Sequence, residues 1–72
     1  MLLKDLKVNE EGVIKSFSCE EGVKTRLYNL GLKEGVKVRV VGFAPFNEPV
    51  EITFNGTFLA LSKSVALNIR VE

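Results

Sequence analysis

The spacing of apolar residues changes along the chain from a helical period to the alternation of a strand. Apolar side chains first recur four and then three positions apart, at Val23, Leu27 and Leu30. That spacing places them on one face of a helix. From Val36 to Val40, valines alternate with basic residues, which is the pattern of a half-buried strand. The pattern therefore predicts a helix over residues 20–30, followed by a strand that begins at residue 36.

Local signals mark both ends of the predicted helix. Ser18 and Glu21 have the spacing of an N-terminal capping box, in which the serine side chain accepts a hydrogen bond from the first turn of the helix. Gly31 follows the last apolar position of the helix, where a left-handed cap favours a residue without a Cβ. Gly35 then turns the chain before the strand. We expect a tight corner between helix and sheet.

A hairpin is predicted at Asn55 and Gly56, because this pair accepts the positive φ angles of a type I′ turn. With two loop residues, Phe54 faces Thr57, and the pairing along both strands can be counted from there. The count places four aliphatic residues on a buried face, namely Val50, Ile52, Leu59 and Leu61. The opposite face pairs Glu51 with Ala60 and Thr53 with Phe58. A large aromatic side chain, Phe58, is therefore expected at the solvent.

The remaining segments complete a small sheet. Leu3 and Leu6 are expected beneath it, a turn occupies residues 9–12, and a first strand runs over residues 13–17. Residues 62–67 read as a helical turn, and residues 68–71 as a last strand that pairs back to the first. We predict an all-β fold, a small SH3-like barrel with one short α-helix inserted after the first strand. No repeat or linker divides the chain, so residues 1–72 are expected to form a single domain.

Composition narrows the class of protein. A chain of 72 residues with 46% hydrophobic and 26% charged residues is typical of one folded domain. No apolar run approaches the roughly 20 residues that span a bilayer, and the first residues lack a signal-peptide pattern, so we expect a cytoplasmic protein without membrane insertion. A single cysteine agrees with a reducing compartment. The net charge of +1 argues against a nucleic-acid partner.

The reactive residue types argue against catalysis. The chain has no histidine, the commonest general base and transition-metal ligand. Cys19 is interpreted as a helix-start residue and, at most, as a weak and incidental zinc ligand. The paired glutamates at positions 10–11 and 20–21 are interpreted as solvated surface. No glycine-rich phosphate loop is present, so we expect neither an enzyme nor a cofactor.

The candidate binding residues are therefore those suited to a protein partner. The loop of residues 42–49 contains Pro45, Phe46 and Pro49, and Phe46 either offers an aromatic contact or folds back over the core. Phe58 is the exposed aromatic of the hairpin. Arg26 lies next to the apolar stripe of the helix, where it contacts a partner or, as we favour, pairs internally with a carbonyl or carboxylate group.

An ordered set of residues resembles the FeoA family of small proteins that accompany the ferrous-iron transporter FeoB. The set comprises Leu3, Asp5, Leu6, Gly12, Val13, Ile14, Arg26, Leu27, Leu30, Gly31, Leu32, Gly35, Ala44, Pro45, Glu48, Pro49, Val50, Gly56, Leu59, Ala60, Leu61, Ala66 and Ile69. It spans nearly the whole chain. The sequence departs from the family after Leu61, where Ser62 replaces the usual arginine and Val65 precedes Ala66 in place of a glutamate.

The resemblance implies a non-catalytic accessory protein of ferrous-iron uptake, whose partner is the cytoplasmic, GTPase-bearing region of FeoB. An alternative is a stand-alone SH3-like module that acts on an iron-dependent transcriptional regulator, because similar barrels form the C-terminal domains of repressors of the diphtheria toxin repressor type. Whether the protein forms a homo-oligomer is left open by the sequence.

Overall fold

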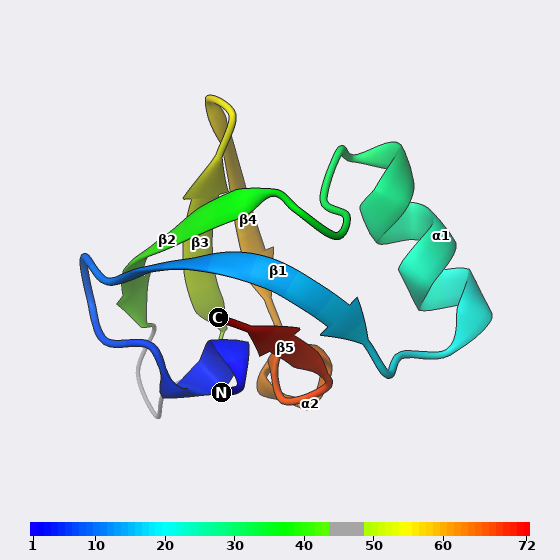
Figure 1. The fold of residues 1–72 in the computed structure, drawn as a ribbon, viewed down its shortest axis with the longest axis horizontal. Helices are drawn as coiled ribbons and strands as arrows, with labels where there is room; N and C mark the ends of the chain where they lie inside the picture. The colour runs from blue at the N-terminus through cyan, green and yellow to red at the C-terminus, as the bar shows by residue number, and fades with distance from the viewer. Residues whose placement is uncertain (44–48) are drawn as a thin grey trace.

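The computed structural model describes residues 1–43 and 49–72. They fold into five antiparallel strands and three short helices (Figure 1). The strands are β1 (Glu11–Phe17), β2 (Lys37–Phe43), β3 (Val50–Phe54), β4 (Thr57–Leu61) and β5 (Ile69–Val71); the helices are the 3₁₀ helix η1 (Leu3–Asp5), α1 (Glu21–Asn29) and α2 (Lys63–Ala66). The predicted order of elements, with the main helix after the first strand, is confirmed.

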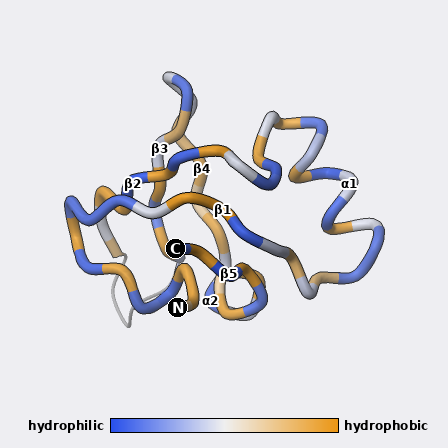
Figure 2. The backbone as a smooth tube through the Cα atoms, viewed as in Figure 1, coloured by the Kyte–Doolittle hydropathy of each residue, from blue (hydrophilic) through white to orange (hydrophobic). Residues whose placement is uncertain are grey.

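The strands form one sheet in the order β4-β3-β2-β1-β5. The first half of β1 pairs with β2, and its second half pairs with β5, so β1 joins the two ends of the fold. This pairing confirms that the last strand returns to the first. Figure 2 shows hydrophilic residues before β1 and at the hairpin tip, and also at intervals along α1.

The hairpin register is confirmed pair by pair, from Phe54 opposite Thr57 to Val50 opposite Leu61. Asn55 and Gly56 have φ angles of 48° and 78°, as a type I′ turn requires. Val50, Ile52 and Leu61 are buried in the core, whereas Leu59 is only partly buried. The expectation that Leu59 is a full core residue was therefore wrong, because its side chain lies at an open groove between β4 and α1.

The core gathers side chains from every element of the fold. Its largest fully buried members are Leu3, Ile14, Leu32, Ile52, Ile69, Val38, Val40, Val50 and Val71. Leu3 and Leu6 lie in this cluster, as predicted. Val38 and Val40 are fully buried while Lys37 and Arg39 are exposed, which confirms the alternation read from the sequence.

The C-terminal end of α1 is as predicted, but its N-terminal end is not. Gly31 has a φ of 95° and Gly35 a φ of 90°, so the glycine corner is confirmed. The capping box is wrong: Glu20 is the N-cap, without a side-chain hydrogen bond. The backbone N–H of Ser18 donates instead to the carbonyl of Asn68 at 2.7 Å, so Ser18 continues the pairing of β1 beside β5. Leu30 caps the helix at its other end and is 45% exposed, so it is not part of the buried stripe.

Candidate partner-binding surface

The outward face of the hairpin continues across four strands. Consecutive pairs link Glu11 with Arg39, Arg39 with Thr53, and Thr53 with Phe58. We call this row of four residues the sheet platform. Phe58 is 59% exposed, which confirms that it faces the solvent. The platform therefore offers an aromatic ring at one end and charged groups at the other.

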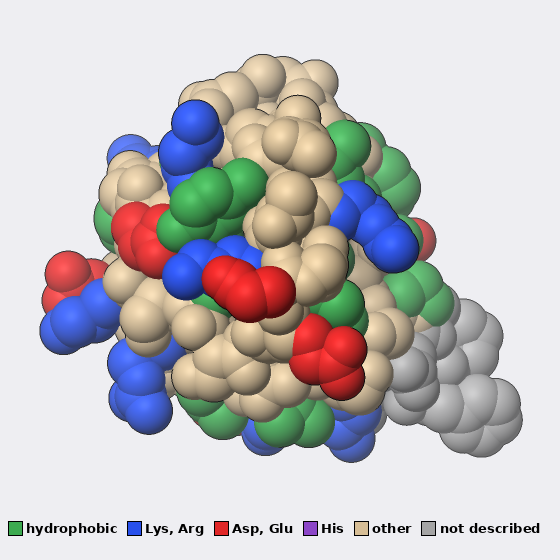
Figure 3. Space-filling model, turned by 90° about the vertical axis from the view of Figure 1, so that its right-hand side faces the viewer, with side chains coloured by type: hydrophobic (Ala, Val, Ile, Leu, Met, Phe, Trp, Pro, Cys, Tyr) green, Lys and Arg blue, Asp and Glu red, His purple; other side chains and the backbone are tan. Residues whose placement is uncertain are grey.

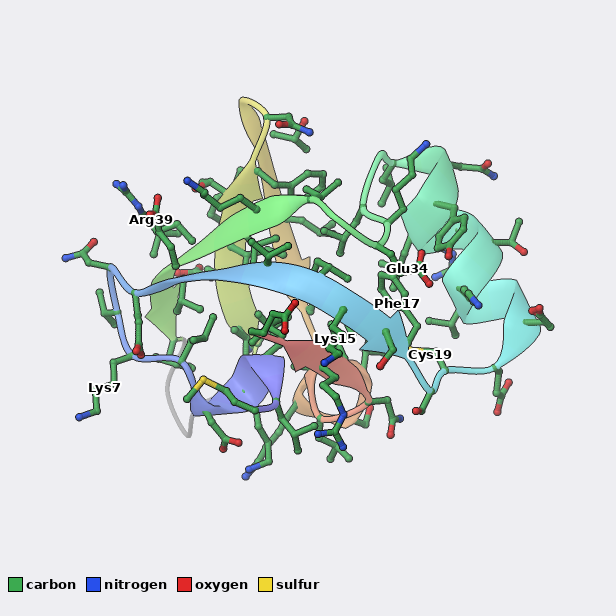
Figure 4. All side chains as sticks on the ribbon, viewed as in Figure 1. Lys7, Lys15, Phe17, Cys19, Glu34 and Arg39 are labelled. Carbon is green, nitrogen blue, oxygen red and sulfur yellow. The ribbon has the colours of Figure 1, made fainter. Side chains whose placement is uncertain are left out.

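The charges of the sheet platform are already paired. The Arg39 Nη2 atom lies 3.1 Å from the Glu11 Oε2 atom. Both side chains are about half exposed, so this ion pair contributes little to stability and a partner could displace it. Figure 4 shows Arg39 on β2, away from α1. A partner on the platform would gain mainly from covering Phe58, because the ring is the largest exposed apolar group there.

A groove of about 230 Å³ separates α1 from β4. Val23, Leu27 and Leu30 line it from the helix, and Leu59, Ala60, Leu61, Ser62 and Val65 line it from β4 and the segment after β4. Among the described residues, Arg26 is the only charged one in this lining. Figure 3 looks onto the side of the molecule that carries α1, where hydrophobic side chains lie among charged ones. We call this feature the α1–β4 groove.

The predicted binding residues do not gather into one cluster. Phe58 lies on the sheet platform, whereas Arg26 lies in the α1–β4 groove. Within residues 1–43 and 49–72, the Arg26 side chain is exposed and makes no hydrogen bond or ion pair, so the favoured internal pairing is not found there. Pro49 is half-buried just before β3. Pro45 and Phe46 lie outside the described residues.

A polar contact that the sequence did not indicate holds the corner after α1. The Tyr28 hydroxyl donates a hydrogen bond to the Glu34 carboxylate. This bond raises the pKa of Tyr28 to about 12, with smaller contributions from burial and from the negative charge of Glu34. The ring of Tyr28 also contacts Phe17 edge-on at 5.7 Å, and the Lys24 Nζ atom lies 5.6 Å from its centre. Phe17 and Glu34 lie beside α1 in Figure 4.

The residues that could react or bind metal are dispersed. Cys19 lies between β1 and α1 (Figure 4), and burial raises the pKa of its thiol, an effect that Lys24 partly offsets. It precedes the N-cap Glu20, so the prediction that it starts the helix was wrong by one residue, and its raised pKa disfavours the thiolate form. The glutamates at positions 10, 11, 20 and 21 are exposed, as predicted. In the part of the chain that the structure describes, no three His, Cys, Asp or Glu residues are grouped to hold a metal ion.

The fold is that of a small SH3-like domain that exposes an aromatic side chain on the sheet platform and an apolar groove beside α1. None of the helices among the described residues is long and apolar enough to cross a membrane. A family model described as the FeoA domain matches residues 1–72. The chain therefore belongs to the FeoA family, as the resemblance in its sequence indicated.

Individual relatives agree with this assignment. An Fe(2+) transport protein A of Methanocaldococcus jannaschii is 32% identical over 66 residues, which cover 92% of this chain and 78% of the relative. The solution structure of FeoA from Chlorobium tepidum has a TM-score of 0.96 at 36% identity, and the match covers all of this chain and 69% of that one. Stenotrophomonas maltophilia FeoA complexed with zinc, described as a prokaryotic SH3 domain protein, has a TM-score of 0.84 at 29% identity, covering 100% and 89% of the two chains.

The fold is also similar to part of a metal-dependent regulator whose sequence is only distantly similar. A manganese-dependent transcriptional repressor has a TM-score of 0.88 at 15% identity, and the match covers 99% of this chain and 40% of that one. At this identity the likeness shows the shared fold and nothing further.

Proposed function

We propose that the protein is a non-catalytic, cytoplasmic accessory protein of ferrous-iron uptake that binds the cytoplasmic GTPase region of a FeoB-type transporter. Membership of the FeoA family supports a role in iron transport, as does the Fe(2+) transport protein of M. jannaschii. The FeoA family is one of small accessory SH3-like domains, which supports a role by contact and not by catalysis.

The exposure of Phe58 is the observation that carries this proposal. A phenylalanine that is 59% exposed on a regular strand adds nothing to the core, and aromatic residues that become buried on association dominate the energy of many interfaces. Thr53 lies directly beside Phe58 and Arg39 beyond it, so a partner that covers the ring also meets polar groups. Phe58 is therefore the proposed anchor of the contact.

The other residues proposed for this contact are Arg26, Pro45, Phe46 and Pro49. Arg26 is exposed, and Pro49 ends the segment that leads into β3. Pro45 and Phe46, which are outside the described residues, remain sequence-based proposals.

Contact alone can regulate a transporter. If this protein binds one conformation of the transporter more tightly than another, the population shifts toward the bound conformation by the ratio of the two affinities. Ferrous iron is then the cargo of the transporter. A role on an iron-dependent transcriptional regulator has only the shared fold in its favour.

Binding to the purified GTPase region of the transporter tests the proposal. Phe58→Ala should weaken binding by about 2 kcal/mol, or roughly 30-fold, while the free energy of unfolding stays nearly unchanged. Leu67→Ala is the matched control, because Leu67 is a second exposed hydrophobic residue and lies outside the platform. A cell that carries Phe58→Ala in place of the wild type should grow more slowly when ferrous iron is limiting. Unchanged binding by a folded Phe58→Ala variant would place the contact elsewhere.

A further inference from the structure

The two edges of the sheet are protected very differently. At the β5 edge, Leu2 bridges to Arg70, and the Val71 N–H donates to the Met1 carbonyl at 2.8 Å. The N-terminal segment therefore covers that edge. β4 is the other edge, and its sequence from Thr57 to Leu61 contains no charged residue or proline. Such residues are the usual protection of an exposed edge against a further strand.

The register identifies which groups of β4 are unpaired. Phe54 and Thr57 flank a two-residue turn and exchange backbone hydrogen bonds. Because hydrogen-bonded pairs alternate along an antiparallel ladder, Thr57, Leu59 and Leu61 are the residues of β4 whose backbone groups point toward β3. Phe58 and Ala60 belong to the other set, and their N–H and C=O groups point away from β3. Within the described ranges, no backbone group outside the sheet accepts a hydrogen bond from these two residues or donates one to them. They offer two donors and two acceptors in the spacing of an extended strand.

The α1–β4 groove runs along this same edge. Its lining includes Leu59 and Leu61 from the inner face of β4 and Ala60 from the outer face. Residues from both faces of a strand can line the same groove only if the groove lies along the edge of that strand. The side chains of Val23 and Leu30 supply the opposite, helical wall. A strand placed beside β4 would therefore bury one row of its side chains against apolar groups.

We propose that the α1–β4 groove binds an extended peptide segment of a partner protein, which adds to β4 as a sixth strand. The unpaired backbone groups of Phe58 and Ala60 require a polypeptide backbone as the occupant, since strand addition satisfies alternate N–H and C=O groups together. The apolar lining requires aliphatic residues at alternate positions of the segment. Arg26, the single charge among the described residues of the lining, favours a carboxylate on the segment.

This inference shares Arg26 with the proposed function but does not depend on which protein carries the segment. It adds a second mode of contact, through the backbone edge, to the contact through the ring of Phe58. A synthetic peptide tests it without any transporter, so the two proposals succeed or fail independently.

The probe is a capped peptide of about seven residues, long enough to span β4, in which valine alternates with threonine and one terminal valine is replaced by glutamate, so that the carboxylate lies in the row that faces the groove and Arg26. In the isotopically labelled protein, the peptide should slow amide hydrogen exchange at Phe58 and Ala60 by at least about tenfold, because each amide gains a hydrogen bond. Two N-methylated forms of the peptide sharpen the test. Methylation of one alternate set of amides should abolish binding, and methylation of the other set should not, because only one set faces β4.

Variants of the protein complete the test. Ala60→Pro removes an N–H that points away from β3 and should weaken binding about tenfold, while Ala60→Ser keeps the N–H and should bind as the wild type does. Arg26→Ala should weaken the glutamate peptide about two- to fivefold and leave a glutamine version unaffected.

Two results would overturn the inference. If both methylated peptides bind equally well, or if Phe58 and Ala60 gain no protection, the edge does not accept a strand. If these amides are already protected from hydrogen exchange in the free protein, and if that protection increases with protein concentration, the edge pairs with a second copy of the chain and not with a partner peptide.

Discussion

Replacement of Ile52 by alanine tests the packing on which both surfaces depend. Ile52 is fully buried and lies between Val40 on β2 and Leu59 on β4. The change removes three carbon atoms, worth about 0.8 kcal/mol each in transfer free energy, and the residual cavity adds a further term. We therefore expect a loss of roughly 2 to 5 kcal/mol. A 72-residue domain has a total stability of about 4 to 11 kcal/mol, so the loss is a large fraction of the whole.

Urea denaturation followed by circular dichroism measures this loss. With an m-value near 1 kcal/mol per molar for a small domain, the midpoint should fall by about 2 M or more. Thr53→Ala is the matched control, because Thr53 is the next residue on the same strand and faces outward; it should cost less than about 1 kcal/mol. Should Ile52→Ala fail to fold, Ile52→Val should cost about 0.5 to 1.5 kcal/mol. Equal losses from Ile52→Ala and Thr53→Ala would refute the assignment of the two faces.

Three further predictions concern the helix corner and metal binding. Gly22→Ala should stabilise the protein by about 0.5 kcal/mol, because the added Cβ meets no atom within 4 Å. Gly31→Ala should destabilise it by about 1 kcal/mol, because the φ of Gly31 is 95°. Thermal denaturation in which both variants change the stability in the same direction would contradict this pair of predictions. Glu34→Gln should lower the pKa of Tyr28 from about 12 toward 10 in an ultraviolet absorbance titration, and an unshifted Tyr28 titration would exclude the bond. Because the pKa of Tyr28 is raised in the folded protein, the stability that the bond contributes should be present below pH 10 and be lost as the pH rises from about 10 to about 12. Anaerobic calorimetry with ferrous ion should detect no stoichiometric site, because the chain has no histidine and a single cysteine, Cys19; a dissociation constant near 1 μM, about −8 kcal/mol, would show that a site exists.

The features that the sequence predicted correctly depend on neighbouring residues. The turn at Asn55 and Gly56 fixes the hairpin register, and that register alone places Phe58 on the outward face. The glycine corner after α1 is equally local, because Gly31 and Gly35 are selected by their own backbone angles.

The features that the sequence did not predict depend on contacts between distant segments. Ser18 does not cap α1, because its N–H donates to Asn68, next to β5. Leu30 and Leu59 have the sequence pattern of core residues, but both line the α1–β4 groove, which exists only because α1 packs beside the free edge of the sheet. The bond between Tyr28 and Glu34 likewise needs the fold of the corner, since neither residue indicates it alone.

We propose that the protein acts by contact between its sheet platform and the cytoplasmic GTPase region of a ferrous-iron transporter. The most direct measurement is a titration of the isotopically labelled protein with that region, followed by nuclear magnetic resonance residue by residue. The largest changes should appear at Phe58, Thr53 and Arg39, and Phe58→Ala should weaken binding roughly 30-fold. Binding that leaves these residues unchanged and perturbs the covered edge at β5 would contradict it.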